Sequence, residues 1–445
     1  MNTTTPSNPA RGARIPRALA GRGPLAVALV ALLVRLVFCF LVYPRVASRL
    51  HWLHVDDGFD QLAASLLAGH GFRFSPTLPP NLTTPPGYAF FLAFVFRLTG
   101  VAMNEGWRIW IVQSLLDTGT TVLIMAIAWR LLDSRRGALW AGMLYALYPQ
   151  IIAYCARPFG EVLATFLLAL AVLVAIEVDR RPAWLSAFLA GALFGLAALV
   201  KEKILVFPVL LAVAILWRWR RRGARQGAIA AVSVALGAAI AVGPWIARDY
   251  HLTGEIMPIT SRTGRALHWG LRGDYAAGDP DVREFGPGET HHESWGMVPP
   301  TRSGDPGTPE ARQRLEGDDR LLDSSFRVIR ENPGHFLKMI PVKVLAFWYW
   351  GQPGVIWANY ATQIPLLVLG VWGVILARDR GRLMVPLLLV IYFAGVHALL
   401  VARMRYSLPV MPYVVLFAGY TLSRMTERPA RVAHPAAVAP AAPAR

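Results

Sequence analysis

The 445-residue chain has few charged residues and almost no cysteine. Only 16% of its residues are charged, compared with about a quarter in an average soluble domain, and 55% are hydrophobic. This composition excludes a disordered chain and argues against a soluble multi-domain enzyme. The two cysteines, Cys39 and Cys155, both lie in apolar runs, so they support neither a disulfide framework nor a metal site.

The sequence also lacks the motifs of nucleotide-driven and common hydrolytic chemistry. It contains no Walker phosphate loop and no glycine-rich dinucleotide fingerprint after a strand. It likewise contains no His-Glu-x-x-His motif and no nucleophile elbow. An ATP-driven pump is therefore disfavoured.

Long apolar runs are what the chain does contain. A helix needs about 20 mostly apolar residues to cross about 30 Å of hydrocarbon. Ten stretches qualify, some of them short: 24–43, 107–130, 137–155, 159–178, 183–200, 203–217, 227–246, 360–377, 384–402 and 405–423. The first is too long for the apolar part of a signal peptide, and no small-residue cleavage pattern follows it, so we expect a retained helix. The sequence therefore predicts an all-α polytopic membrane protein with about ten transmembrane helices.

The excess of basic residues has a topological explanation. The chain has 45 Lys and Arg residues against 27 Asp and Glu, a net charge of +18 that on a soluble protein would suggest nucleic-acid binding. Here the basic residues gather in the N-terminal tail and in alternate short connections between apolar runs. Basic residues in short loops stay on the cytoplasmic side. We therefore expect both termini inside and no nucleic-acid partner.

This topology divides the chain into five parts. Residues 1–23 and 424–445 are expected to be cytoplasmic tails, the second of them disordered. The other three parts are an N-terminal transmembrane module at 24–246 with an outer loop at 44–106, a large extracytoplasmic loop at 247–359, and the C-terminal transmembrane helices at 360–423.

Apolar spacing predicts shorter helices inside the two long outer segments. These are 59–67 and 88–98 in the first segment, and 310–332 and 335–350 in the second. The helix at 335–350 is amphipathic and rich in aromatic residues, so we expect it to lie on the outer membrane surface.

Two adjacent carboxylates, Asp56 and Asp57, follow the first span. Such a pair near an apolar surface can bind a divalent metal or supply a general base. The competing interpretation is structural: one of the two caps the helix at 59–67, which would end at Gly69. The two interpretations are compatible.

A further acid, Glu161, lies in the apolar start of the fourth span. An ion pair with Arg157, four residues earlier on one helix face, would explain it without any function. Pro158 weakens that explanation, because proline disfavours a continuous helix through both residues. A functional role and a structural ion pair both stay open.

Basic residues from three distant parts of the chain fall at the same expected membrane depth. They are Lys201 and Lys203 at one outer turn, Arg248 after the seventh span, and Arg405, followed by Tyr406, at the last outer turn. Lysines at such turns often extend to the interface without any function. The shared depth favours instead a common site for an anionic head group, such as a lipid-linked phosphate.

Five ordered stretches also carry a resemblance to a known family. They are Asp56-Asp57-Gly58-Phe59 with the residues up to Phe72, Pro85-Pro86-Gly87-Tyr88, residues 195–201, residues 243–250, and Arg405-Tyr406 with Pro409 and Pro412. In this order they resemble motifs of the polytopic C-type glycosyltransferases, specifically the bacterial relatives of protein mannosyltransferases and of the aminoarabinose transferase that modifies lipid A. Thr83 and Thr84 stand where the aminoarabinose transferases have an acid and a lysine, so the resemblance does not extend to that substrate.

The resemblance implies the C-type glycosyltransferase fold and transfer of a sugar from a polyprenyl-phosphate donor to an extracytoplasmic acceptor, which is a lipid, a glycan or a protein. Asp56 or Asp57 would act as the base, and Glu161 would bind hydroxyl groups of the sugar or acceptor. The donor phosphate would meet Lys201, Lys203, Arg248, Arg405 and Tyr406.

The same resemblance implies a multi-pass protein of the bacterial inner membrane, in contact with membrane lipids, whose active site faces outward. No cofactor is certain, and no feature of the sequence demands a metal, although a divalent ion is compatible with it. The alternative function is a lipid-linked sugar flippase or secondary transporter without transferase activity. Arg35, inside the first span, fits that alternative better than it fits a transferase.

Overall fold

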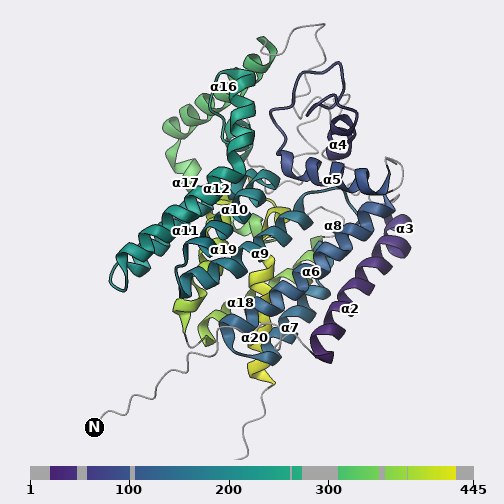
Figure 1. The fold of residues 1–445 in the computed structure, drawn as a ribbon, viewed down its shortest axis with the longest axis vertical. Helices are drawn as coiled ribbons and strands as arrows, with labels where there is room; N and C mark the ends of the chain where they lie inside the picture. Colours follow the sequence, from purple (N-terminus) through teal and green to yellow (C-terminus); the bar gives the residue numbers. More distant parts are fainter. Residues whose placement is uncertain are drawn as a thin grey trace, which may run out of the picture.

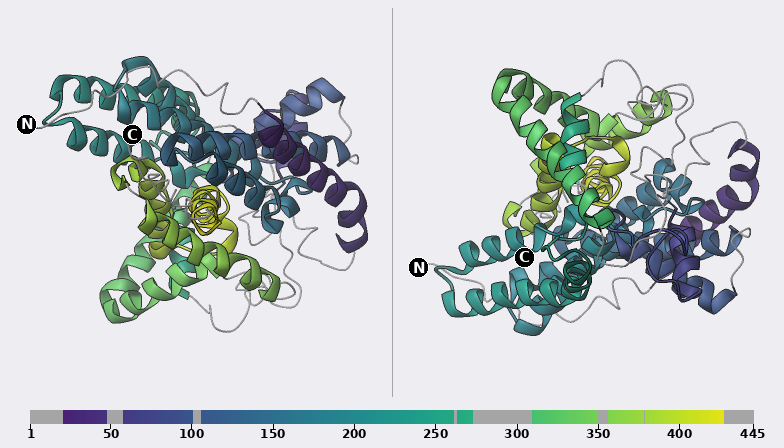
Figure 2. Two further views of the ribbon diagram at one scale, coloured as in Figure 1. Left: turned by 90° about the horizontal axis from the view of Figure 1, so that it is seen from below. Right: turned by 90° about the horizontal axis from the view of Figure 1, so that it is seen from above.

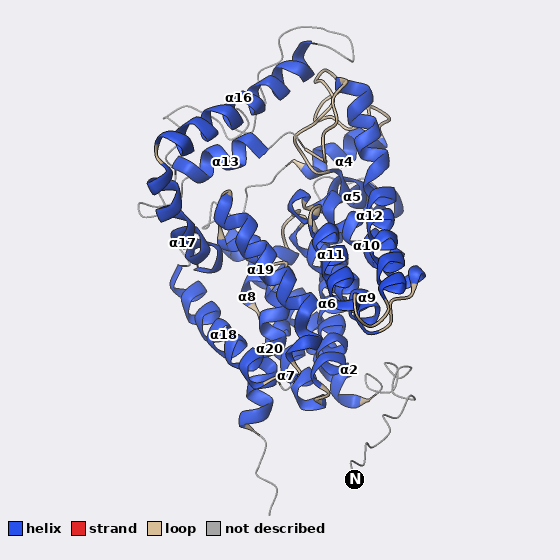
Figure 3. Cartoon of the chain, turned by 90° about the vertical axis from the view of Figure 1, so that its left-hand side faces the viewer, coloured by secondary structure: helices blue, strands red, loops and turns tan. Residues whose placement is uncertain are grey.

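The computed structural model describes residues 21–47, 58–100, 106–260, 263–272, 309–349, 356–377 and 379–426. Within these ranges every regular element is a helix, as Figure 3 shows. The predicted all-α class is therefore confirmed.

Each of the ten predicted spans coincides with a helix or with consecutive helices. The helices are α2 (Arg22–Val37) with η2 (Phe38–Val42) and α3 (Tyr43–Ala47), α6 (Trp107–Leu132), α7 (Arg135–Ala146) with α8 (Pro149–Cys155), α9 (Glu161–Arg180), α10 (Trp184–Val200), α11 (Phe207–Trp219), α12 (Ala224–Thr253), α18 (Ile356–Leu376), α19 (Met384–Leu399) and α20 (Met411–Met425). Six of the described helices are long and apolar enough to cross a membrane, or seven if α7 and α8, bent by 55°, form one span. The chain is thus a multi-pass membrane protein, while the total of ten crossings stays a prediction.

The last helix lies at the centre of the bundle. Figure 2 shows α20 end-on, in yellow, with other helices around it and α2, in purple, at the edge. Every residue from Met411 to Thr421 is buried. In α2, by contrast, Leu25, Leu29 and Leu33 are each more than half exposed and follow one another at four-residue spacing. Such a stripe suits a helix face in contact with lipid.

Glycines allow the backbones of α10 and α12 to touch. A Cβ atom added at Gly191 would lie 2.0 Å from the carbonyl oxygen of Val234, and one at Gly237 would lie 2.1 Å from that of Phe188. Close backbone approach through small residues stabilises membrane helix pairs, because lipid supplies no hydrophobic driving force between them.

We expect Gly237→Ala to lower the thermal stability of the protein, because the new methyl group would collide with the carbonyl of Phe188. Overpacking of this kind costs about 1–3 kcal/mol. Gly243→Ala is the matched control, since it lies in the same helix and a Cβ there meets nothing within 4 Å. Unfolding midpoints of the two purified variants in one detergent measure the effect, and equal midpoints would speak against this packing.

The short basic connections meet at one end of the bundle. Arg382, in the turn η6 (Arg380–Leu383), pairs with Asp133 after α6 at 2.9 Å. Arg218, near the end of α11, pairs with Asp179 near the end of α9 at 2.7 Å. Alternate connections therefore lie on one side, as the sequence pattern indicates. That this side is cytoplasmic stays a prediction.

At the opposite end, five helices from the two long segments cover the bundle (Figures 1 and 3). We call them the outer layer: α4 (Phe59–Leu67), α5 (Pro86–Thr99), α13 (Thr263–Arg272), α16 (Pro309–Glu331) and α17 (Pro333–Tyr349). Four of them match helices predicted from apolar spacing. The fifth, α13, was not predicted.

The N-cap of helix α4 is Gly58, not an aspartate. Gly58 occupies the N-cap position with a φ of 68°, a left-handed conformation that favours glycine. The interpretation of Asp56 or Asp57 as the N-cap is therefore wrong, and both aspartates lie outside the described residues. The predicted stop is confirmed: Gly69 has a φ of 77°, and the N–H of His70 donates to the carbonyl of Ser65 at 3.0 Å.

Arg35 is neutralised inside the bundle. Its side chain is fully buried in α2 and forms an ion pair of 2.5 Å with Asp117, which lies in the middle of α6. Asp117 also accepts a hydrogen bond of 2.6 Å from the hydroxyl of Tyr145. Since buried charges persist when they are paired and hydrogen-bonded, the packing of α2 on α6 and α7 accounts for Arg35 without a transport pathway.

Candidate functional site

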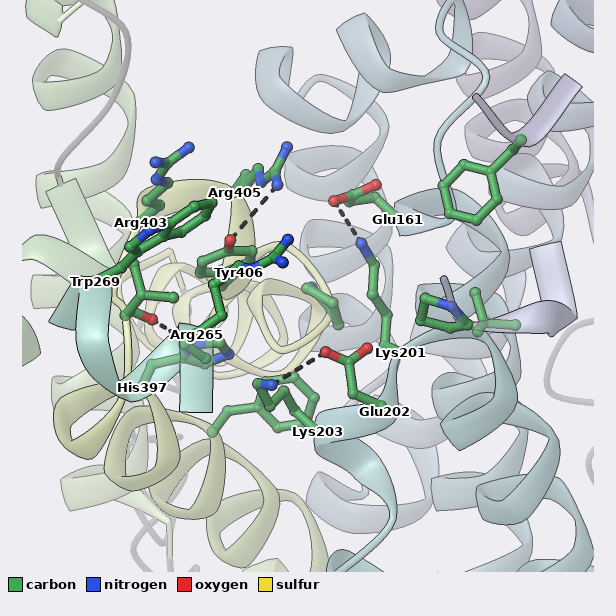
Figure 4. A pocket seen from close by; sticks show the side chains of 17 residues that line it. Glu161, Lys201, Glu202, Lys203, Arg265, Trp269, His397, Arg403, Arg405 and Tyr406 are labelled. Atoms are coloured by element: carbon green, nitrogen blue, oxygen red, sulfur yellow. Dashed lines mark hydrogen bonds and ion pairs between the residues drawn. The ribbon is translucent and has the colours of Figure 1, made fainter. Parts of the chain in front are cut away.

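A pocket between the outer layer and the bundle gathers charged side chains from distant parts of the sequence (Figure 4). We call it the outer pocket. Its charged lining residues are Glu161, Lys201, Glu202, Lys203, Arg265, Arg403 and Arg405. Five cations against two carboxylates give the pocket a positive potential, which suits an anionic ligand.

The acid Glu161 lies at the start of α9 and pairs with Lys201. Lys201 Nζ donates to Glu161 Oε1 at 2.8 Å, and the glutamate side chain is 1% exposed while the lysine is 22% exposed. Because α8 ends at Cys155 and α9 begins at Glu161, Arg157 and Glu161 do not share a helix. The alternative of an ion pair with Arg157 on a single helix face is therefore wrong.

Two glycines bring Lys201 to this place. A Cβ atom at Gly87 of α5 would lie 2.8 Å from the backbone of Leu199, and one at Gly160 would lie 2.9 Å from the side chain of Val200. Both contacts are made at the last residues of α10, where Lys201 is the C-cap. The short helix η4 (Glu202–Ile204) follows, and within it Lys203 pairs with Glu202 at 3.0 Å.

The turn between α19 and α20 supplies the next group. It contains the short helix η7 (Met404–Ser407). The guanidinium of Arg405 lies 5.2 Å from the ring centre of Tyr406 and 5.9 Å from that of Phe159. Aromatic faces at such distances hold a guanidinium in one orientation, and Nη2 of Arg405 also donates to the hydroxyl of Tyr406 at 3.5 Å. Both predicted residues of this turn, Arg405 and Tyr406, line the pocket.

The helix α13 of the outer layer contributes three residues that no sequence pattern indicated: Arg265, Ala266 and Trp269. Asp318 of α16 caps this helix, because its carboxylate accepts the backbone N–H groups of Gly264 at 3.0 Å and Arg265 at 2.9 Å. A Cβ at Gly264 would lie 1.9 Å from the carbonyl oxygen of Asp318, so only glycine permits the approach. The sequence of α13 has no long apolar pattern. The only feature that could have predicted this helix is the amphipathic spacing of its ten residues.

Arg248 does not line the outer pocket with the other predicted cations. Its Nη1 donates to Asp249 Oδ1 at 2.6 Å and to the carbonyl of Asn81 at 3.1 Å. Its guanidinium lies over the rings of Trp245, at 4.3 Å, and Phe72. Arg248 thus joins α12 to the segment before α5, and donor binding by Arg248 stays a prediction that this arrangement does not favour.

The structure brings five of the predicted site residues together: Glu161, Lys201, Lys203, Arg405 and Tyr406. The predicted base, Asp56 or Asp57, lies outside the described residues, although Phe59, two positions further on, lines the pocket. Among the residues that the structure describes, no cluster of three or more His, Cys, Asp or Glu side chains could hold a metal.

The outer layer is fixed to the bundle next to the pocket by Lys343 of α17. The side chain of Lys343 is fully buried, and its Nζ donates to the carbonyl of Leu399 at 3.4 Å. Carbonyls in the last turn of a helix have no partner within the helix, and a cation there is favourable. Burial lowers the pKa of Lys343 to about 8.

We expect this lysine to make stability depend on pH. Between the folded pKa of about 8 and the ordinary lysine pKa of about 10.4, the unfolded chain binds more protons than the folded one, so stability rises with pH. As pH falls from about 10.4 toward the folded pKa of about 8, this stabilisation is lost again, and the loss is complete once pH has fallen through 8. Lys343→Met should remove the rise, as measured by unfolding midpoints from pH 7 to 10.5. An unchanged pH profile in this variant would show that another group is responsible.

Comparison with known proteins shows which families and structures this chain is similar to. Residues 83–247 match the family model of the dolichyl-phosphate-mannose-protein mannosyltransferases. No curated protein sequence matches the chain. The fold is similar to that of the oligosaccharyltransferase of Archaeoglobus fulgidus, crystallised with a tethered acceptor peptide containing the NVT sequon, with a TM-score of 0.53 and 12% identity. That alignment covers 91% of this chain and 50% of the other, so the chain spans half the length of that enzyme.

A second solved structure also aligns with the chain. It is ArnT from Cupriavidus metallidurans bound to undecaprenyl phosphate, with a TM-score of 0.36, 16% identity, and coverage of 90% of this chain and 77% of the other. The segment that matches the mannosyltransferase model contains Glu161, Lys201 and Lys203 of the outer pocket. The chain therefore has the fold of the C-type membrane glycosyltransferases, and its residues 83–247 are similar to the dolichyl-phosphate-mannose-protein mannosyltransferases.

Proposed function

We propose that the protein is a membrane glycosyltransferase that moves a sugar from a polyprenyl-phosphate donor to an extracytoplasmic acceptor. One observation carries this proposal. Cations from the end of α10, from α13 and from the turn before α20 converge with the buried Glu161 in one pocket, at the end of the bundle opposite the basic connections.

The pocket fits a lipid-linked phosphate. Its cations lie at the ends of apolar helices, so a prenyl chain can lie along the bundle while its phosphate meets Lys201, Lys203 and Arg405. These cations would stabilise the negative charge that grows on the leaving phosphate in the transition state. Arg405 can donate two parallel hydrogen bonds to phosphate oxygens. The matched family is named after dolichyl-phosphate-mannose, a sugar carried on a lipid phosphate. This name supports the same class of donor.

The carboxylates take the remaining roles. Lys201 holds the carboxylate of Glu161 in one orientation, so that it can accept hydrogen bonds from sugar or acceptor hydroxyls. Asp56 or Asp57 accepts the proton of the attacking hydroxyl or amine. In a single displacement the bond from the anomeric carbon to the phosphate oxygen breaks, and the bond to the acceptor forms with inversion. The basic ends opposite the pocket support an outward-facing site in the bacterial inner membrane.

A transfer assay tests this function against a flippase or transporter. The full chain, in vesicles, receives a panel of synthetic undecaprenyl phosphates that carry radiolabelled mannose, glucose, galactose or arabinose, together with an extract of cell-envelope lipids and proteins. We expect label from one donor to move from the lipid to a new covalent partner. If instead the donor crosses the vesicle membrane with its sugar still attached and no sugar is transferred, the protein is a transporter and the proposed transferase function is wrong.

A further inference from the structure

A histidine in the outer pocket is not used by the proposed reaction. His397 lies near the end of α19, lines the pocket, and is 3% exposed. Its ring stacks on the ring of Tyr406, at 4.6 Å and 11°, and on that of Phe347 from the outer layer, at 5.4 Å and 18°. The imidazole is therefore held in one plane at the junction of α17, α19 and η7.

One hydrogen bond determines which nitrogen of His397 carries the proton. Nδ1 lies 2.9 Å from the carbonyl oxygen of Val401. A carbonyl oxygen only accepts, so Nδ1 must be the donor. A second proton on the ring is disfavoured by the aromatic surroundings and by the five cations of the same pocket. His397 is thus a neutral ring whose Nε2 carries a lone pair.

We infer that this lone pair faces the pocket that His397 lines. Stacking occupies the ring faces and Val401 occupies the Nδ1 edge, so the edge with Nε2 is the part left to meet a ligand. Within the described residues Nε2 makes no hydrogen bond. Nε2 is not among the buried polar atoms that lack a partner, so a ligand in the pocket that supplies a donor can reach it.

We propose that Nε2 of His397 accepts a hydrogen bond from a substrate hydroxyl group and so selects for that hydroxyl. The inference rests on the proposed function. A phosphate is excluded as the partner, because its oxygens are acceptors and belong with the lysines and arginines. The hydroxyl comes from the sugar of the donor or from the acceptor, both of which must reach this pocket.

Two substitutions separate this role from a structural one. In His397→Asn the amide nitrogen can still donate to the carbonyl of Val401, but the acceptor at the position of Nε2 is lost. In His397→Gln the amide reaches the position of Nε2, but the bond to Val401 is lost. We expect His397→Asn to lower kcat/KM at least about tenfold with the panel donor that turns over fastest, and His397→Gln to stay within about threefold of the unmodified protein.

Binding measurements identify the source of the hydroxyl. Undecaprenyl phosphate without a sugar should bind the unmodified protein and both variants equally well. Weaker binding of the sugar-bearing lipid to His397→Asn would place the hydroxyl on the donor sugar. Unchanged binding with slower transfer would place it on the acceptor. Either result supports the proposal.

Three results would overturn it. Loss of activity only in His397→Gln would show that the ring merely holds Val401, and full activity in both variants would show no role. Equal loss in both would mean that the acceptor atom is not what matters. If the unmodified protein transfers sugar from no donor of the panel, the proposed function itself fails, which is a separate result.

Discussion

Replacement of Arg405 by alanine is expected to lower sugar transfer from the polyprenyl-phosphate donor about 100-fold or more. Removing a single preorganised donor from the charge that develops in a transition state typically has an effect of this size. Arg405 lies in the turn that reaches the pocket, with its guanidinium over Phe159 and Tyr406. Arg405→Lys should recover part of the rate, because it keeps the charge but not the two parallel hydrogen bonds.

Arg382→Ala is the matched control for this substitution. Arg382 is also an arginine in a connection between helices, but it lies at the opposite end of the bundle, where it is 42% exposed and pairs with Asp133. We expect its rate to match that of the unmodified protein. A transfer rate that falls equally in both variants, or in neither, would contradict the assignment of Arg405 to the donor phosphate.

Replacement of Asp117 by alanine is expected to cause the largest loss of stability. It would leave the guanidinium of Arg35, which is fully buried, without its counter-charge. Removing one partner of a buried ion pair costs about 3–5 kcal/mol, because the other charge remains desolvated. The hydroxyl of Tyr145 would lose its acceptor as well. The unfolding midpoint of the purified protein in detergent measures this loss.

Two comparisons make the result specific. Asp133→Asn breaks an exposed ion pair with Arg382, which is worth about 0–1 kcal/mol, so its midpoint should change little. The double variant Arg35→Met/Asp117→Leu removes both charges together and should recover much of the stability. A double variant as unstable as Asp117→Ala would show that packing, and not the unpaired charge, is responsible.

Most of the fold could be predicted from the sequence, because it depends on patterns that are local in the chain. Runs of apolar residues indicate the spans, and helical spacing indicates α16 (Pro309–Glu331) to within two residues of the expected 310–332. The helix α4 (Phe59–Leu67) ends as expected because Gly69 adopts a left-handed conformation. Each of these signals needs only neighbouring residues.

The site was predicted only in part. The sequence indicates how deep a residue lies in the membrane, but not where it lies within the membrane plane. Lys201, Arg248 and Arg405 are expected to share a depth, because each follows the end of a predicted span. Their lateral positions depend on how the helices pack, and the packing brings Lys201 and Arg405 to the outer pocket but turns Arg248 toward Asn81.

Pairing between distant residues was missed for the same reason. Asp117 is 82 residues from Arg35, and no local pattern marks the two as partners. His397 is a single histidine in an apolar run, and Arg265 lies in a segment without a strong helical pattern. Only the tertiary structure brings His397 and Arg265 to one pocket.

The most direct measurement is an experimental structure of the full chain with undecaprenyl phosphate. We expect the phosphate in the outer pocket, within hydrogen-bond distance of Lys201 or Arg405, and the prenyl chain along the bundle. A phosphate bound beside Arg248 and Trp245, or at the opposite end near Arg382 and Arg424, would contradict the assignment of this pocket to the donor.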